Sequence, residues 1–325
     1  MALSATTRAE AARLLEKSLG PEILACMADP EVEDLFLNAD GACFAQYAGR
    51  KVRLETVLPP EARFVIIGYA GSIIGTTADG VTRYTVDGKL HSGHRFHGVL
   101  PPRAVDGPYI VMRNPPKKIY RIGDYVDAGV MTAAVAGGLE VALADRETIV
   151  IVGVTGSGKT SLLTCMLNHP ATVGDRIALL EDTEEVNVEA VPDRVVKSTL
   201  GGTMRELVYD VLRERPQRIV IGEGRDGAVW DWVKAVMTGH RGSMITLHAD
   251  NAADGMERLE QLAAEVVTDV ATQRSLLIRT VRRLVPVQVL PDGRRHVPGI
   301  YEPYDHQGGG YRVRALCGVP IQTII

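Results

Sequence analysis

The second half of the chain alternates between short apolar runs and longer segments with helical periodicity, and this alternation limits the possible folds most. The runs TIVIVG, RIALLE, QRIVIG and SMITLHA are almost continuously apolar, which is typical of strands that are buried on both faces. The segments between them place apolar residues at helical spacing, as amphipathic helices do. Strands and helices that alternate in this way form a mostly parallel sheet covered by helices. The sequence therefore predicts an α/β domain over residues 134–325.

Residues 1–125 predict a smaller α+β domain. The chain starts with apolar residues at helical spacing, and the alternation around Asn38–Gly41 predicts a hairpin. The segment EARFVIIGYAGSIIG predicts a buried helix despite its glycines, whereas proline pairs between GHRFHGV and NPPKK separate short strands. We predict that residues 126–133 link the two domains.

Composition narrows the classes of function. The chain has 325 residues, a net charge of −4 and a pI of about 6.1, so sequence-specific nucleic-acid binding is not expected. The four cysteines are scattered without a CxxC pair, which predicts neither a zinc site nor a disulfide framework. No segment at the start resembles a secretion signal, and the most apolar window, FVIIGYAGSIIG, is shorter than the roughly 20 residues that span a bilayer. We expect a cytoplasmic protein whose contact with the membrane is peripheral and made through partners.

The segment GVTGSGKT matches the phosphate-binding pattern G-x-x-x-x-G-K-[ST], and it lies between a predicted strand and a predicted helix. Its glycines let backbone N–H groups turn toward phosphate oxygens, and the helix N-terminus adds positive potential. Lys159 would reach the β- and γ-phosphates, and the Thr160 hydroxyl would bind Mg²⁺. We predict that a nucleoside triphosphate binds to Gly153, Val154, Thr155, Gly156, Ser157, Gly158, Lys159, Thr160 and Ser161.

Carboxylates follow two of the strands that come after this loop. RIALL runs into the acidic cluster 181–185, and RIVIG is followed by Glu223, which is suited to hold Mg²⁺ or its water. A carboxylate at a neighbouring strand end can polarise the water that attacks a phosphate. A solvated acidic turn would explain the first cluster alone. Two such strands after one phosphate loop favour a RecA-like, ATP-hydrolysing domain over a nucleotide kinase.

Four segments then carry a resemblance to a known family. GVTGSGKT, RIALLEDTEE, RERPQRIVIGEGR and TGHRGSMITLHAD resemble the Walker A, acidic, Walker B and histidine boxes of the type II/IV secretion ATPase superfamily, in the same order. This superfamily includes the VirB11-like traffic ATPases and the pilus motors. ADPEVEDLFLNADG, GHRFHGVLPP and YIVMRNPP resemble its N-terminal domain, and among the subgroups the chain is most similar to the conjugal-transfer TrbB proteins. The resemblance covers roughly residues 20–300.

The resemblance implies roles for acidic residues of the second domain. Glu185 matches the glutamate that polarises water, with Glu181 and Asp182 closer to the strand end. Glu223 matches the Walker B glutamate, a candidate Mg²⁺ ligand, and Arg225 matches the arginine that follows it.

Arginines and histidines complete the implied site. Arg95 and Arg113 match arginines of the N-terminal domain that reach toward phosphate and stabilise the charge of the transition state. A surface ion pair is the alternative interpretation for either arginine. His240 and His248 bracket one predicted strand, and the resemblance implies that both sense or transmit the nucleotide state. In the absence of that context, two histidines flanking a strand are more often structural.

As a whole, the resemblance implies a homo-hexameric ATPase that uses ATP and Mg²⁺. Such a protein docks on channel proteins at the cytoplasmic face of the inner membrane and energises type IV secretion, conjugative pilus assembly and conjugal DNA transfer. A pilus retraction or type II secretion motor shares this chemistry and remains an alternative. A DNA translocase or helicase would need a basic channel, which the acidic composition does not favour. A regulatory switch without turnover conflicts with the intact acidic residues.

Overall fold

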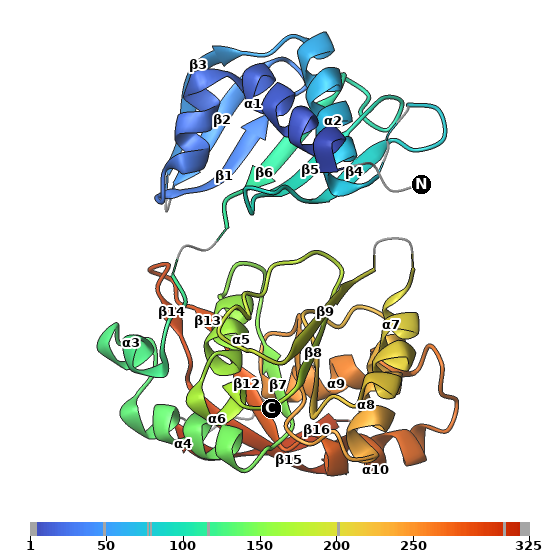
Figure 1. Cartoon of the computed structure of the whole chain (residues 1–325). Coiled ribbons are helices and arrows are strands. Elements are labelled where there is room, and N and C mark those ends of the chain that lie inside the picture. The colour runs from blue at the N-terminus through green and yellow to red at the C-terminus, as the bar shows by residue number, and fades with distance from the viewer. Residues whose placement is uncertain are drawn as a thin grey trace. The chain divides into compact units, whose positions relative to one another are not determined.

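The computed structural model describes residues 5–47, 50–76, 78, 80–115, 118–199, 202–307 and 310–318. The chain divides into two compact units, Met1–Lys117 and Lys118–Ile325, each of which is described by itself (Figure 1). Helix α3 (Ile122–Asp127) belongs to the second unit, because Ile122 is buried in one of the cores of that unit. The division therefore precedes residue 125, and the segment 126–133 holds the end of α3 and the start of the next helix.

The first unit is an antiparallel sheet with two helices. The strand order is β3-β2-β1-β6-β5-β4, and the predicted turn at Asn38–Gly41 joins β1 to β2, with Gly41 at a φ of +92°. The helices contribute Leu19, Ile23 and Ile66 to the core of this unit. The elements are α1 (Ala5–Ala28), β1 (Val32–Leu37), β2 (Ala42–Tyr47), β3 (Arg50–Val57), α2 (Pro60–Ile74), β4 (Thr85–Lys89), β5 (Arg95–Val99) and β6 (Tyr109–Arg113).

The second unit contains an eight-stranded sheet in the order β16-β15-β12-β7-β11-β10-β8-β9. The six strands from β12 to β9 are parallel, and β15 and β16 add an antiparallel edge. A separate two-stranded sheet pairs β13 with β14. The strands are β7 (Ile149–Val152), β8 (Ile177–Glu181), β9 (Arg194–Ser198), β10 (Arg218–Ile221), β11 (Met244–Leu247), β12 (Arg283–Pro286), β13 (Gln288–Val289), β14 (Arg295–His296), β15 (Gly299–Gln307) and β16 (Gly310–Gly318).

Helices cover both faces of this sheet (Figure 1). One core lies among α3, α4 and α5, and a second core, which contains Trp230 and Trp232, lies among α7, α8, α9 and α10. The prediction of a mostly parallel α/β domain next to a smaller α+β domain is therefore confirmed. The helices are α4 (Ala133–Ala144), α5 (Lys159–Leu167), α6 (Pro170–Val173), α7 (Met204–Val211), the 3₁₀ helix η1 (Leu212–Glu214), α8 (Ala228–Met237), α9 (Ala252–Ala263) and α10 (Val270–Thr280).

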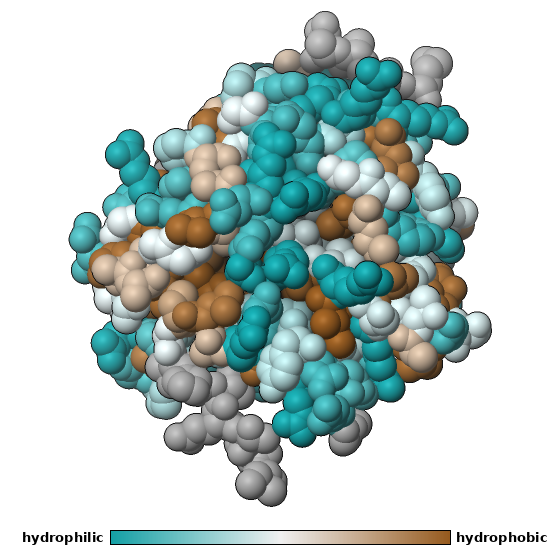
Figure 2. Space-filling model, turned by 90° about the horizontal axis from the view of Figure 1, so that it is seen from below, coloured by the Kyte–Doolittle hydropathy of each residue, from teal (hydrophilic) through white to brown (hydrophobic). Residues whose placement is uncertain are grey.

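The surface of the described residues is mixed. Within them, no helix is both long and apolar enough to cross a bilayer. On the face seen in Figure 2, hydrophilic side chains separate several apolar areas. Exposed apolar side chains such as Val105 and Val141 are ordinary for a folded chain.

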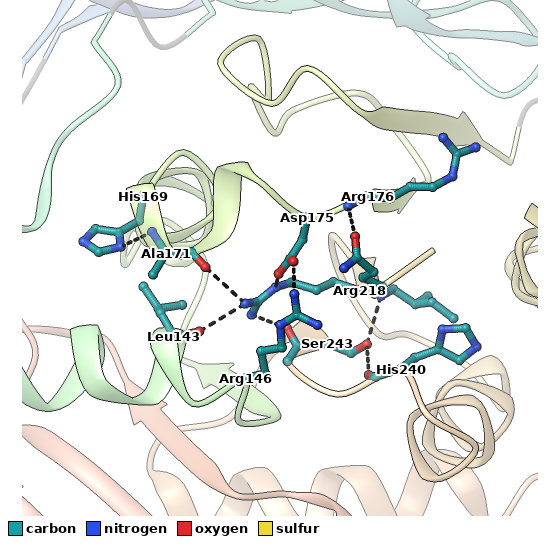
Figure 3. A network of polar contacts seen from close by, with 12 residues as sticks. Leu143, Arg146, His169, Ala171, Asp175, Arg176, Arg218, His240 and Ser243 are labelled. Atoms are coloured by element: carbon teal, nitrogen blue, oxygen red, sulfur yellow. Dashed lines mark hydrogen bonds and ion pairs between the residues drawn. The ribbon is translucent and has the colours of Figure 1, made fainter. Parts of the chain in front are cut away.

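A buried ion pair joins the elements at the edge of the second sheet where the parallel strands begin (Figure 3). The fully buried Arg218 donates from Nε to Asp175 Oδ2 at 2.6 Å. Its other nitrogens donate to the carbonyls of Gly242 and Leu143, both at 3.1 Å, and Arg146 binds the second oxygen of Asp175. A Cβ at Gly242 would lie 2.4 Å from Arg218, so only glycine fits there. One arginine thus ties β10 to α4 and to the chain segments before β8 and β11.

Replacing this arginine tests how much the pair stabilises the unit. The variant R218A would leave Asp175 buried with one half-exposed partner, and we expect the free energy of unfolding to fall by about 3–5 kcal/mol. The matched control R146A removes that half-exposed partner and should cost less than about 1 kcal/mol. Both tryptophans lie in this unit, so the denaturation midpoint followed by tryptophan fluorescence reports on it. Equal midpoints for the two variants would contradict the prediction.

Candidate functional site

The register of the parallel strands brings predicted site residues to one edge of the second sheet. Leu247, which ends β11, pairs with Val152, which ends β7. Ile221, which ends β10, pairs with Leu180 of β8. Because parallel strands end at the same edge, the groups that follow them lie close together. These groups are the phosphate loop, Asp182, Glu223 and His248.

The glycines of the phosphate loop are required by its geometry. A Cβ at Gly153 would lie 2.3 Å from the Val287 carbonyl oxygen and 2.6 Å from Ser157 Oγ. Gly156 and Gly158 have φ angles of +75° and +102°, which side chains other than that of glycine rarely adopt. The loop therefore follows a path against its neighbours that larger residues would block.

The ammonium of Lys159 lies across the loop. It donates to the carbonyls of Gly153 at 2.7 Å and Val154 at 2.9 Å, and it lies 3.5 Å from Nδ1 of His248. Burial lowers the pKa of Lys159, and two nearby carboxylates oppose that effect. The partly exposed pair Thr160–Ser161 follows in the first turn of α5. A positive charge and a helix N-terminus thus meet at the end of β7, as phosphate binding requires.

Glu223 is the centre of a chain of charged groups. His248 Nε2 lies 2.9 Å from one Glu223 oxygen, and Arg225 donates to the other at 2.9 Å. Arg225 also lies 3.3 Å from Asp182. Burial raises the pKa of Glu223, but the hydrogen bond from Arg225 and the charges of Arg225, His248 and Lys159 together hold it below its ordinary value. The structure therefore brings together five predicted residues, with Glu223 as an anion. They are Lys159, Asp182, Glu223, Arg225 and His248.

Glu181 has a different role from its neighbours in the acidic cluster. Only 3% of this residue is exposed, and its Oε1 accepts hydrogen bonds from the backbone N–H groups of Glu185 at 3.0 Å and Val186 at 2.9 Å. Gly222 makes room for it, since a Cβ there would lie 2.9 Å from Glu181 Cγ. Burial raises the pKa of Glu181 to about 7. Its side chain thus closes the turn that carries Glu185.

The structure does not bring His240 to the phosphate loop. His240 lies before the start of β11, at the opposite edge of the sheet from His248, and its Nδ1 is 2.8 Å from the Pro216 carbonyl oxygen. Its own carbonyl accepts a hydrogen bond from Ser243 Oγ at 2.7 Å, beside the Arg218 pair (Figure 3). The two histidines bracket the strand as predicted, but a strand that is extended between them separates them rather than presenting both to one site.

Arg95 and Arg113 lie in the first unit, opposite each other on β5 and β6. Arg113 donates from Nε to Asp34 Oδ1 at 2.9 Å while its side chain remains 55% exposed. Arg95 Nε lies 3.9 Å from Asp87 Oδ1. The two arginines thus lie side by side on the sheet, each near an aspartate, and their role toward phosphate stays a prediction.

Helix α9 borders the site; the sequence predicts this helix over NAADGMERLEQLAAEV, but its residues were not among the predicted site residues. A pocket of about 460 Å³ opens between the phosphate loop and α9. The signal for its role is that polar residues recur at helical spacing directly after His248, on a helix that starts at the ending edge of the sheet. The pocket is lined by Val154, Thr155, His248, Ala249, Asp250, Asp254, Glu257, Arg258 and Gln261.

Comparison with known proteins identifies the family. A family model described as "Type II/IV secretion system protein" matches residues 87–297, a stretch that contains the phosphate loop and every charged group of the Glu223 chain. The chain belongs to this family. The resemblance inferred from the four sequence boxes is confirmed.

Relatives within the family carry conjugal-transfer names. The chain is 35% identical over 286 residues to "Conjugal transfer protein TrbB" of Rhizobium radiobacter, which covers 87% of each chain. It is 32% identical over 306 residues to "Probable conjugal transfer protein TrbB" of Sinorhizobium fredii (strain NBRC 101917 / NGR234), which covers 93% of each. The solved structure of the Legionella pneumophila ATPase DotB matches with a TM-score of 0.65 at 20% identity, over 88% of this chain and 80% of that one, and shows the shared fold.

The buried acid predicts a specific pH dependence of stability. The pKa of Glu181 rises from 4.5 to about 7 on folding, so the folded state binds the proton more tightly and stability falls as the pH rises from about 4.5 to 7. E181Q keeps the accepting oxygen and cannot ionise. We expect its stability relative to the wild type to increase across this window, by on the order of 2–3 kcal/mol. Thermal unfolding midpoints of both proteins at pH 5 and pH 8 measure the difference. A difference between the two midpoints that is the same at both pH values would contradict the prediction.

Proposed function

We propose that this chain is an ATPase that assembles into a homo-hexameric ring and energises conjugal DNA transfer through a type IV secretion channel, including assembly of the conjugative pilus. The observation that carries the proposal is the chain of polar contacts from Lys159 through His248, Glu223 and Arg225 to Asp182, at the mouth of a phosphate loop. The conjugal role is inferred from the names of the TrbB relatives. The ring would dock on channel proteins at the cytoplasmic face of the inner membrane.

In this proposal the loop binds the phosphates of ATP. Backbone N–H groups of the loop and the N-terminus of α5 face the phosphate oxygens, and Lys159 exchanges its two carbonyl partners for them. Among the described residues, no group of three or more His, Cys, Asp or Glu is arranged to hold a metal ion. Mg²⁺ held by Thr160 and Glu223 would therefore complete its shell with phosphate oxygens and water, which is its usual habit at nucleotide sites.

The acidic turn supplies the groups that act on water. Glu185 polarises the attacking water, and Glu181 holds the backbone of Glu185 in place through its two hydrogen bonds. His248 lies between Lys159 and Glu223, at 3.5 Å and 2.9 Å, so a change in the partners of Lys159 on nucleotide binding alters the contacts of His248. His248 thereby reports whether the γ-phosphate is present.

The arginines of the first unit supply positive charge in the transition state. Arg113 is half exposed, with Arg95 beside it on the neighbouring strand. An arginine placed at the γ-phosphate stabilises the charge that spreads over its oxygens during transfer. We assign this role to Arg113 of an adjacent subunit in the ring, with Arg95 in support.

Two substitutions separate binding from hydrolysis. K159A removes the ammonium of the loop, so we expect loss of ATP binding and of phosphate release. E185Q removes the carboxylate that polarises water, so we expect ATP affinity to persist while kcat falls by about 10²- to 10⁴-fold. The neighbouring exposed residue provides the matched control E184Q, which should retain activity. Turnover of E185Q at the rate of E184Q would exclude the proposed role of Glu185.

Mixed assemblies test the ring and the arginine. With Mg²⁺ and a non-hydrolysable ATP analogue, light scattering should give six times the subunit mass of 35.1 kDa. K159A and R113A should each be inactive alone, whereas their mixture should regain part of the activity, because an intact loop then meets an intact Arg113 from the adjacent subunit. The mixture of K159A and E185Q is the matched control and should stay inactive, since both defects lie in the loop-bearing unit. A stable monomer, or no recovery in the first mixture, would contradict the proposed arrangement.

A further inference from the structure

The small hairpin of β13 and β14 lies against the phosphate loop. It follows β12, which flanks β7 on the side opposite β11. Where the chain leaves β12, the Val287 N–H donates to the Val152 carbonyl at 2.7 Å, and the Val287 carbonyl is the group that excludes a Cβ at Gly153. The hairpin therefore approaches the loop from the side opposite His248.

One side chain of this hairpin reaches the last glycine of the loop. A Cβ at Gly158 would lie 3.5 Å from Cδ of Arg295 and 3.8 Å from its Nε. The guanidinium of Arg295 is thus beside the turn that leads into Lys159 and the N-terminus of α5. This is the part of the loop whose N–H groups face the phosphates that remain after hydrolysis.

Arg295 has no structural partner that explains this position. It is exposed, and no hydrogen bond or ion pair joins its guanidinium to any other residue in the described part of the chain. Its neighbour Arg294 is different, because its Nε donates to Asp292 Oδ2 at 2.6 Å. Burial raises the pKa of the Tyr125 hydroxyl of α3, and the charge of Arg295 opposes that rise.

We propose that Arg295 is a nucleotide-binding residue that donates to the α- or β-phosphate of the bound nucleotide, an assignment that rests on the proposed function. A planar guanidinium can donate two parallel hydrogen bonds to phosphate oxygens, and the α5 N-terminus adds to the positive potential at the same place. Because Arg295 approaches from the side opposite His248 and Glu223, it contacts the phosphates shared by ATP and ADP rather than the γ-phosphate. Replacing Arg295 should therefore weaken the binding of ATP and the binding of ADP by the same factor.

The adjacent arginines of one hairpin provide the test. Calorimetric titration of Mg-ADP, and of Mg²⁺ with a non-hydrolysable ATP analogue, compares the wild type with R295A, R295K, R294A and K159A. We expect R295A to raise both dissociation constants by about 10- to 100-fold, as for the loss of a hydrogen bond to a charged group. R295K should give an intermediate value, and R294A should stay within about two-fold of the wild type because its charge is paired with Asp292.

The outcomes separate this inference from the proposed function. If R295A binds both nucleotides as tightly as R294A does while K159A loses binding, Arg295 has no role in binding and the proposed function remains. If R295A weakens the binding of the ATP analogue but not that of ADP, Arg295 contacts the γ-phosphate, and the assignment to the α- or β-phosphate is overturned. A wild-type chain that binds neither nucleotide would overturn both proposals. Thermal midpoints of R295A and R294A should agree, since neither side chain is buried.

Discussion

The common direction of the strands in the second unit is the constraint on which the site depends. Because β7, β8, β10 and β11 are parallel, their ends share one edge and their beginnings share the other. Both edges carry charged side chains, but these side chains have different roles at the two edges. At the starting edge Arg218 and Asp175 are buried and satisfied by each other and by carbonyls, which fixes the strands in place. At the ending edge Glu223, Arg225 and His248 are partly or largely exposed, so their contacts can change when an anion binds.

The sequence predicted the buried strands and the phosphate loop because these elements carry strong local signals. Continuous apolar runs indicate strands buried on both faces, and the loop needs glycines at fixed positions. The elements that it missed have weak signals. Strand β9 lies at the edge of the sheet and has only two apolar residues, both valines, among Arg194, Lys197 and Ser198. The buried face of α10 includes Gln273 and Thr280 beside Leu277. The secondary structure of such segments depends on packing against residues that are distant in sequence. A local sequence pattern does not contain that information.

The site shows the same limit at the level of single residues. The sequence places five residues with carboxyl or hydroxyl groups, 181–185, at the end of one strand. Their spacing does not show which of these side chains turns toward the core. Only the folded chain shows that Glu181 accepts hydrogen bonds from the turn, and that the charge of Glu185 acts on Lys159 of the loop. Spacing also put His240 and His248 at the two ends of one strand, and the rise of about 3.3 Å per residue already excludes their meeting at one phosphate. His240 therefore lies away from the loop of its own subunit, and its role in sensing or transmitting the nucleotide state stays a prediction.

The charge balance at the ending edge determines where the cations that neutralise a bound triphosphate must come from. Arg225 is already engaged by Glu223 and Asp182, so it contributes little positive charge to a ligand. Lys159 alone faces the acidic turn from within the loop, and a triphosphate brought to this edge would meet several carboxylates. The negative charges of the triphosphate and of these carboxylates repel each other more strongly in a partly buried site than in water. Under the proposed function, the additional positive charge therefore comes with the ligand as Mg²⁺ and from side chains outside the loop, namely Arg295 of the same unit and Arg113 of an adjacent subunit.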